Sequence, residues 1–125
     1  MYVIDNTASA NGTSLRGEIV ASYAVLASLF GAPAEADGYK VSGEWTFRDT
    51  ETGAVITLYD WKMTNLYDDN TLTVEEFRAL PEYEWHVGAK DSAIADAFIE
   101  RLSAVLKAYE LPHVKNTEFR LLTEI

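Results

Sequence analysis

Alternation of apolar and polar residues is clearest in the middle of the chain. Residues 41–48 carry Val, Gly, Trp and Phe at odd positions and polar residues at even positions, which predicts a strand with one solvated face. Residues 54–62 are rich in β-branched and aromatic residues, and the intervening residues 49–53 end in a glycine suited to a turn. The pattern predicts an antiparallel hairpin. Residues 15–21 and 83–88 show shorter strand patterns.

Two helices are predicted by their caps and by the spacing of apolar residues. Ser22 is a suitable N-cap for a helix over residues 23–30, which Gly31 would end. Asp91 is a suitable N-cap for a longer helix over residues 92–109. The apolar stripe of the longer helix comprises Ile94, Phe98, Leu102, Val105 and Tyr109, and it is widened by Ile99 and Leu106. Residues 63–82 are polar and acidic, and they form either a long loop or a loop with one helical turn around residues 74–79.

The resulting order of elements is β-α-β-β-β-α followed by a C-terminal tail, in which residues 114–125 form a short strand or an extended arm. This order predicts an α+β fold, with an antiparallel sheet of about four strands packed against two helices. Residues 1–14 are expected to be an N-terminal arm and linker, and residues 15–125 a single domain. The apolar tip, residues 1–4, is either a frayed terminus or an anchor that docks on the sheet or on a neighbouring subunit.

Charge and composition narrow the range of functions. The chain has 125 residues and a net charge of −10, which repels phosphate backbones and anionic membranes at long range. No run of basic residues offsets this charge. The chain has no cysteine, which excludes disulfides and thiolate chemistry and favours a reducing cytoplasm. The first residues do not resemble a signal peptide.

The sequence offers little support for catalysis. It contains neither the glycine-rich dinucleotide fingerprint nor the phosphate-binding loop motif, so no cofactor is expected. The two histidines, His86 and His113, lie 27 residues apart and lack metal-ligand spacing, so no metal site is expected either. Serines are present, but no nucleophile-elbow motif accompanies them. The chain is therefore expected not to be an enzyme.

Aromatic and cationic residues are interleaved near the predicted strands. Trp45 is expected to belong to the core, whereas Trp61 and Trp85 are followed directly by Lys62 and His86. Such interleaving suits a planar ring joined to a phosphate, although ordinary strand alternation produces the same pattern. His86 is either a half-exposed residue bonded to a neighbour or a ligand donor at the rim of the sheet.

Five arginines stand out in so acidic a chain, at positions 16, 48, 78, 101 and 120. Each one alone is expected to be a solvated surface group. A pyrophosphate or phosphodiester would be held only where several of them gather, because the guanidinium group makes bidentate contacts to such anions. Arg48, at the end of a strand, and Arg101, on the long helix, are candidates to converge across a subunit boundary.

A series of short motifs along residues 13–110 resembles a family of small bacteriophage proteins. The motifs are Thr-Ser-Leu-Arg-Gly at 13–17, Phe-Gly at 30–31, Gly-Tyr-Lys at 38–40, Glu-Trp at 44–45, Tyr-Asp-Trp-Lys at 59–62 and Glu-Trp-His-Val-Gly at 84–88. On these motifs the chain resembles the Thoeris anti-defence sponge family. Members of that family sequester cyclic ADP-ribose isomers made by bacterial immune TIR enzymes.

The resemblance implies a non-catalytic homo-oligomer in the cytoplasm of an infected bacterium. Its nucleotide pockets would lie between subunits joined through the long helix and the N-terminal arm. The aromatic residue of the pocket would be Phe77 or Trp85, and the polar residue His86 or Ser92. Arg48, Arg101 and Lys62 would supply positive charge. An asparagine expected near the third strand is not found, and the charge of −10 opposes the binding of an anion.

Two other functions are compatible with the sequence. The acidic surface suits a DNA mimic, or another protein-binding inhibitor, that blocks a host nuclease or a CRISPR effector. An enzyme acting on a small cyclic nucleotide is the third hypothesis, and it lacks a visible acid–base pair. Binding of a small cyclic nucleotide, without nucleic acid or membrane as a partner, is the function that the sequence favours.

Overall fold

The described residues form an antiparallel sheet and three helices. A computed structural model describes residues 1–34, 41–62 and 64–109. The elements follow one another as β1 (Tyr2–Ile4), β2 (Ser14–Ala21), α1 (Tyr23–Phe30), β3 (Glu44–Asp49), β4 (Val55–Tyr59), α2 (Val74–Arg78), β5 (Tyr83–Ala89) and α3 (Ser92–Tyr109). The predicted α+β class is confirmed.

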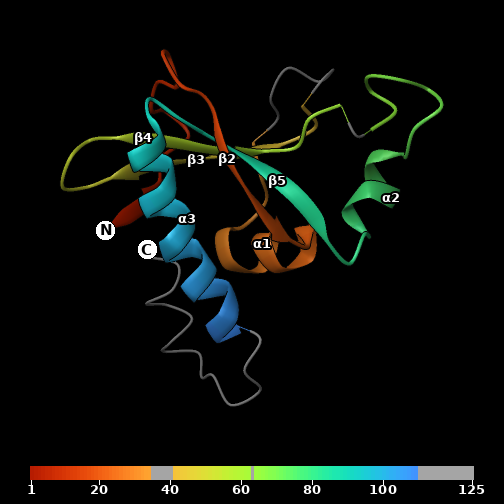
Figure 1. Cartoon of the computed structure of the whole chain (residues 1–125). Helices are drawn as coiled ribbons and strands as arrows, with labels where there is room; N and C mark the ends of the chain where they lie inside the picture. Colours follow the sequence, from red (N-terminus) through yellow and green to blue (C-terminus); the bar gives the residue numbers. More distant parts are fainter. Residues whose placement is uncertain (35–40, 63, 110–125) are drawn as a thin grey trace.

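The five strands are arranged in the order β1-β3-β4-β5-β2, and every neighbouring pair is antiparallel. The first two strands of the chain therefore occupy opposite edges of the sheet (Figure 1). The predicted hairpin forms its centre, with Trp45 opposite Leu58 and Phe47 opposite Ile56. Alternation along these strands sends all four side chains to the same face.

All three helices contact this face through aromatic rings. Phe30 of α1 and Phe98 of α3 both lie against Phe47, with ring centroids 5.0 Å and 4.9 Å away. Phe77 of α2 packs against Trp85 of β5 at 5.6 Å. Figure 1 shows α1 and α3 on the same side of the sheet. The hydrophobic core therefore lies between the helices and this face, which we call the core face.

The helices begin and end where their caps predict. The Ser22 hydroxyl accepts a hydrogen bond from the Val25 amide, and Gly31 takes the positive φ of 80° that ends α1. The Asp91 carboxylate accepts from the Ile94 amide at 2.8 Å and so caps α3. The helical turn at residues 74–79, one of two expected alternatives, is α2, which has a capping box between Thr73 and Glu76.

The expected numbers of strands and helices were too low. The sheet has five strands rather than about four, and there are three helices rather than two among the described residues. The additional helix is the five-residue α2, which is too short to show helical periodicity in the sequence. The predicted strands at 41–48 and 54–62 are also shorter, since β3 begins at Glu44 and β4 ends at Tyr59.

The additional strand, β1, comes from the predicted N-terminal arm. Val3 pairs with Arg48 on β3, and the Tyr2 ring meets Phe98 edge to face at 5.2 Å. The Met1 carbonyl also accepts a hydrogen bond from the Thr50 amide at 2.8 Å. Of the alternatives for residues 1–4, docking on the sheet of the same chain is therefore the one observed. Three residues are too few for sequence alternation to reveal such a strand.

The face opposite the core face, which we call the second face, is only partly solvated. Thr46 and Thr57 point to it but are only 9% and 3% exposed. Residues 5–13, which connect the two edge strands, begin on this face, where Asp5 Oδ2 lies 3.1 Å from Arg48 Nε. Hydrogen bonds from Thr7, together with this contact to Arg48, hold the pKa of Asp5 below its ordinary value. The expectation of a uniformly wet face on β3 was therefore wrong at Thr46.

The expected C-terminal strand or arm at residues 114–125 lies outside the described residues.

Replacing Gly88 by alanine tests how closely the second face is packed. An added Cβ would overlap Thr57 Oγ1, and the β-branched threonine has little freedom to rotate away. We expect Gly88→Ala to lower the free energy of unfolding by about 1–3 kcal/mol, measured by urea denaturation. In a Thr57→Ala background, which lacks this hydroxyl, the same change should cost less. An equal cost in both backgrounds would show that the contact with Thr57 is not the cause.

Candidate ligand-binding surface

A row of aromatic and cationic side chains lies on and beyond the second face of the sheet. We call this row the aromatic strip. It comprises Tyr59, Trp61, Lys62, Tyr67 and His86. Trp61 and Tyr67 are 39% and 36% exposed, so they are among the most exposed large apolar side chains of the described residues. An exposed ring offers a flat surface on which a planar ligand could stack.

Tyr59 connects the two ends of the strip. Its ring meets His86 at 5.6 Å and Trp61 at 6.5 Å, in both cases edge to face. Burial, and secondarily the negative charge of Glu44, raises the pKa of the Tyr59 phenol. The phenol therefore keeps its proton at neutral pH and remains a hydrogen-bond donor.

Lys62 brings a positive charge to the exposed rings. Its Nζ lies 5.5 Å from the centroid of Trp61 and 4.9 Å from that of Tyr67. Each such cation–π contact is worth about 0.5–1 kcal/mol at an exposed site. Lys62 also has a φ of 58°, in the left-handed region that favours glycine. This φ is incompatible with an extended strand, so Lys62 itself cannot belong to β4, contrary to the predicted strand over residues 54–62.

His86 supplies the other nitrogen donor of the strip. It lies on β5 opposite Glu18 of β2, and its Nε2 is 4.0 Å from Glu18 Oε1. The His86 side chain is 19% exposed, which is less than the expected half, and at 4.0 Å its contact with Glu18 is too long for the expected hydrogen bond. The Glu18 carboxylate provides a partner for a protonated imidazole at this position.

Asp60 holds the backbone next to the exposed part of the strip in place through hydrogen bonds. This carboxylate is 1% exposed, and its Oδ1 accepts hydrogen bonds from the amides of Ser42 and Gly43 at 2.9 and 3.1 Å. Tyr83 contributes as well, because its hydroxyl accepts a hydrogen bond from the Trp61 amide at 3.2 Å. The backbone on both sides of residue 60 is thereby fixed to the fold, which orients Trp61 outward.

Asp60 is buried at an energetic cost. Its Oδ2 has no hydrogen-bond partner among the described residues. The neighbouring cavity is lined by aromatic side chains, among them Trp45 and Trp85, and also by Arg78. Burial raises the pKa of Asp60 above its ordinary value, although the hydrogen bonds from Gly43 and Ser42 oppose the shift.

Two residues expected to bind a ligand are part of the core. Phe77 and Trp85 are each 2% exposed, and their rings pack against each other and against Tyr83. The Trp85 indole also donates a hydrogen bond to the Ala21 carbonyl at 2.9 Å. In a single chain their ring faces are covered by protein. Trp45 is likewise 1% exposed, which confirms its expected place in the core.

The remaining expected residues lie away from the strip. Arg48 is paired with Asp5 on the second face, whereas Arg101 is exposed on α3, which packs on the core face. Arg101 borders a shallow hollow of about 330 Å³ with Ala97, Glu100 and Ala104. Ser92 begins α3 close to a second hollow of about 440 Å³, lined in part by Lys90 and Ile94. Within one chain the sheet therefore separates the two arginines.

The strip includes aromatic residues that the expected set of binding residues omitted. Of the seven residues in that set, Lys62 and His86 belong to the strip, while Tyr59, Trp61 and Tyr67 were left out. The interleaving of Trp61 with Lys62 was the signal that pointed here. It could not show that Trp85 faces the core, because residues 61 and 85 follow strand patterns of similar composition.

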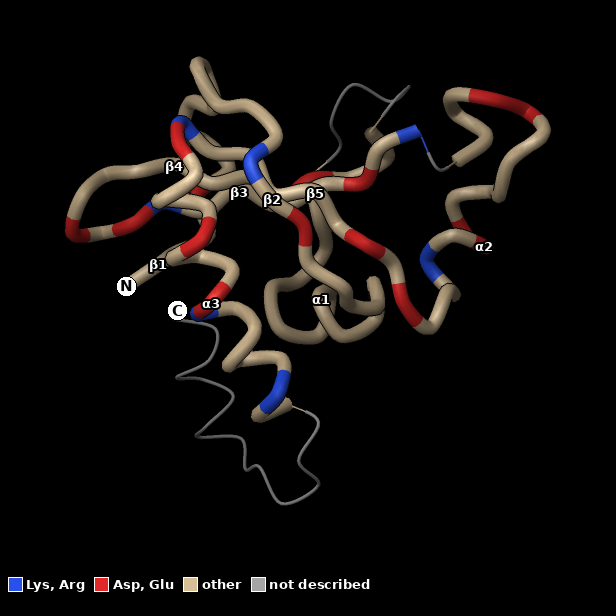
Figure 2. Tube along the Cα trace, in the orientation of Figure 1, with Lys and Arg blue, Asp and Glu red and all other residues tan. Residues whose placement is uncertain are grey.

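Acidic residues outnumber basic ones along the described chain. Figure 2 shows acidic positions on most elements and a few separated basic ones. No group of three or more His, Cys, Asp or Glu residues with the geometry of a metal site occurs within residues 1–34, 41–62 and 64–109. In those same segments, no helix has the length and apolar character needed to cross a membrane.

Comparison with protein-family models and with curated proteins finds no match to this chain.

The unpaired oxygen of Asp60 leads to a prediction about pH. Because the folded protein holds a proton on this carboxyl more tightly than the unfolded chain, wild-type stability falls as pH rises from about 3.9 through the raised pKa. Asparagine does not titrate, so the stability of Asp60→Asn relative to wild type should increase over the same range. Urea denaturation of both proteins from pH 4 to pH 8 measures the difference. A difference that is constant with pH would contradict a raised pKa.

Proposed function

We propose that the protein binds a cyclic ADP-ribose-type nucleotide at the aromatic strip and holds it without cleaving it. One observation carries the proposal: the Lys62 ammonium lies beside two exposed rings, those of Trp61 and Tyr67. A base stacked on such a ring contributes about 1–3 kcal/mol, and an adjacent cation is placed to contact the phosphate that the base carries.

The proposal is supported by the position of the strip on the fold. Trp61 is fixed through Asp60 and Tyr83, so its ring is oriented before a ligand arrives and less conformational entropy is lost on binding. Tyr59 and His86 add hydrogen-bond donors along the same row. The proposed ligand class itself comes from the resemblance to the sponge family in the motifs at 59–62 and 84–88.

We further propose that the complete site lies between copies of the chain. Arg48 and Arg101 lie on opposite sides of the sheet in one chain, so they could approach one ligand only if they came from different subunits. The exposed face of α3 beside Arg101 carries the small residues Ala97 and Ala104, which permit close approach of a second helix. A homo-oligomer of this kind would add guanidinium contacts to the stacking and the charge provided by the strip.

Calorimetric titration with cyclic ADP-ribose tests the proposal. We expect Trp61→Ala to weaken binding about tenfold or more, because the stacking surface is lost. Lys62→Gly should weaken binding to a similar degree with little change in melting temperature, because glycine's preference for the observed φ offsets the loss of the two cation–π contacts. Lys90→Ala is the matched control, because it removes one exposed positive charge just after β5, outside the strip and outside the proposed interface on α3.

The bound nucleotide should be recovered intact by mass spectrometry after heat release. Recovery of a hydrolysed product would indicate an enzyme instead. If cyclic ADP-ribose does not bind wild type and a host DNA-binding protein co-purifies in a salt-sensitive manner, the acidic-mimic hypothesis would replace the proposal. Equal weakening by Lys62→Gly and by the control would show that binding depends on net charge rather than on the position of Lys62 in the strip.

A further inference from the structure

The buried carboxylate of Asp60 has one oxygen whose hydrogen bonding is incomplete. Oδ1 accepts hydrogen bonds from the Ser42 and Gly43 amides, whereas Oδ2 has no partner among the described residues. The cavity that Asp60 lines is too narrow to admit a water molecule. Leaving a buried acceptor unpaired is destabilising, and more so when the acceptor is charged. Either the carboxyl takes up a proton, or a side chain that moves into this cavity supplies a partner for Oδ2.

Arg78, the last residue of α2, lines the same cavity and carries a positive charge. Its guanidinium carbon lies 4.7 Å from the centroid of the Tyr23 ring. Its Nη2 atom is 3.6 Å from the position that a Cβ on Gly43 would take, and the Gly43 amide is bonded to Asp60. None of the ion pairs among the described residues includes Arg78. The guanidinium is thus close to Asp60 but rests on an aromatic ring rather than on a carboxylate.

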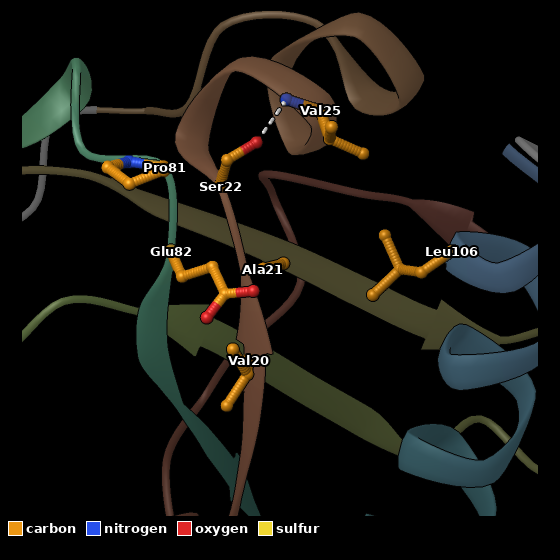
Figure 3. Close-up of a pocket in the computed structure, with 7 residues that line it drawn as sticks. All are labelled: Val20, Ala21, Ser22, Val25, Pro81, Glu82 and Leu106. Carbon is orange, nitrogen blue, oxygen red and sulfur yellow. Dashed lines mark hydrogen bonds between the residues drawn. The ribbon is translucent and has the colours of Figure 1, made fainter. Parts of the chain in front are cut away.

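The residues around Arg78 are fixed by other contacts. Figure 3 shows the Ser22 hydroxyl bonded to the Val25 amide, and this cap fixes the first turn of α1, which contains Tyr23. The same view shows the Glu82 carboxylate beside β2, in a hollow whose lining does not include Arg78. Glu82 is therefore not placed to pair with Arg78, although it is close in the sequence. The long Arg78 side chain is the part of this arrangement that is free to change position.

We propose that Arg78 and Asp60 form a latch in which the guanidinium has two positions, one on the Tyr23 ring and one on Oδ2 of Asp60. An ionised Asp60 draws the guanidinium into the cavity, where the two groups form a charge-assisted hydrogen bond. A protonated Asp60 exerts no such attraction, so Arg78 stays on Tyr23, in the position observed. Ionisation of Asp60 therefore closes the latch, and protonation opens it.

Asp60 is the group that titrates in this arrangement. Burial raises its pKa, although hydrogen bonds from neighbouring groups oppose the shift, so ionisation occurs above the ordinary value of about 3.9. Among the described residues, the other titratable or charged side chains that face it are Arg78 from α2, Tyr23 from α1 and Tyr83 from β5. Burial, and to a lesser degree the charge of Asp60, raises the pKa of the Tyr83 phenol, which therefore stays neutral. The guanidinium keeps its charge throughout.

The latch joins the two ends of the segment that carries the exposed part of the aromatic strip. Asp60 directly precedes Trp61 and Lys62, and Arg78 ends the helix that follows Tyr67 in the chain. When the latch closes, both ends of this segment are tied together, so the chain between them has fewer accessible conformations. When it opens, the α2 end is released. The latch acts without a ligand, so it is independent of the proposed nucleotide binding.

A double-mutant cycle at two pH values tests the latch by thermal melting. Arg78→Gln removes the positive charge, and Asp60→Asn removes the group that ionises. At pH 7.5 we expect Arg78→Gln to lower the melting temperature by about 3 °C or more beyond its effect in the Asp60→Asn background. At pH 4 this difference should shrink, because more of the carboxyl is protonated. The lost contact with Tyr23 affects both backgrounds alike and cancels.

Lys90→Gln is the matched control, because it removes one exposed positive charge outside this cavity. Its effect should be equal in the wild-type and Asp60→Asn backgrounds at each pH. An equal effect of Arg78→Gln in both backgrounds at pH 7.5 would overturn the latch. A difference as large at pH 4 as at pH 7.5 would overturn its control by ionisation of Asp60.

A titration of the Asp60 carboxyl carbon, followed by NMR, provides a second measurement that leaves Asp60 unchanged. We expect the midpoint to be higher in Arg78→Gln than in the wild type by about one pH unit or more, because a nearby opposite charge that favours the ionised form is lost. Lys90→Gln should leave the midpoint close to that of the wild type. Equal midpoints in Arg78→Gln and the wild type would overturn the pairing of Arg78 with Asp60.

Discussion

The layer of aromatic rings between the sheet and the helices is the constraint on which the rest of the structure depends. Trp45 and Trp85 meet edge to face at 5.5 Å, and Phe47 and Phe98 meet at 4.9 Å. Each pair of this kind contributes about 0.5–1.5 kcal/mol beyond its buried area. Because these rings fill the core face, strand alternation directs Tyr59 and His86 to the second face. The aromatic strip is thus a consequence of how the core is packed.

Short-range contacts at the aromatic strip determine how so acidic a protein could hold an anionic ligand. The chain carries a charge of −10, and Glu18 lies next to His86 within the strip region. Charges more than about 8 Å away are largely screened at physiological salt, so the near contacts dominate. Lys62 is the cation placed directly at the exposed rings. Stacking on Trp61 should therefore supply more of the affinity than long-range electrostatics, unless further arginines come from neighbouring subunits.

The sequence predicted those features that depend on local chemistry. The caps at Ser22 and Asp91 and the central hairpin are set by neighbouring residues, and they were identified correctly. β1 was missed as a strand because its partner is more than 40 residues away and only three of its residues pair. In the candidate site, alternation could not distinguish Trp61 from Trp85, since Trp85 is covered by the distant rings of Trp45 and Phe77 whereas Trp61 lies beyond the end of β4. The burial of Asp60 was not predicted, because it results from hydrogen bonds with the amides of Ser42 and Gly43, which are distant in the sequence.

The most direct measurement is tryptophan fluorescence during a titration with cyclic ADP-ribose. Trp45 and Trp85 are 1% and 2% exposed, whereas Trp61 is 39% exposed, so a ligand that stacks on the surface should alter the emission of Trp61 alone. We expect quenching that saturates in the wild-type protein and is absent in Trp61→Phe, which retains a ring for binding but not the fluorophore. Undiminished quenching in Trp61→Phe, or none in the wild type, would contradict binding at the aromatic strip.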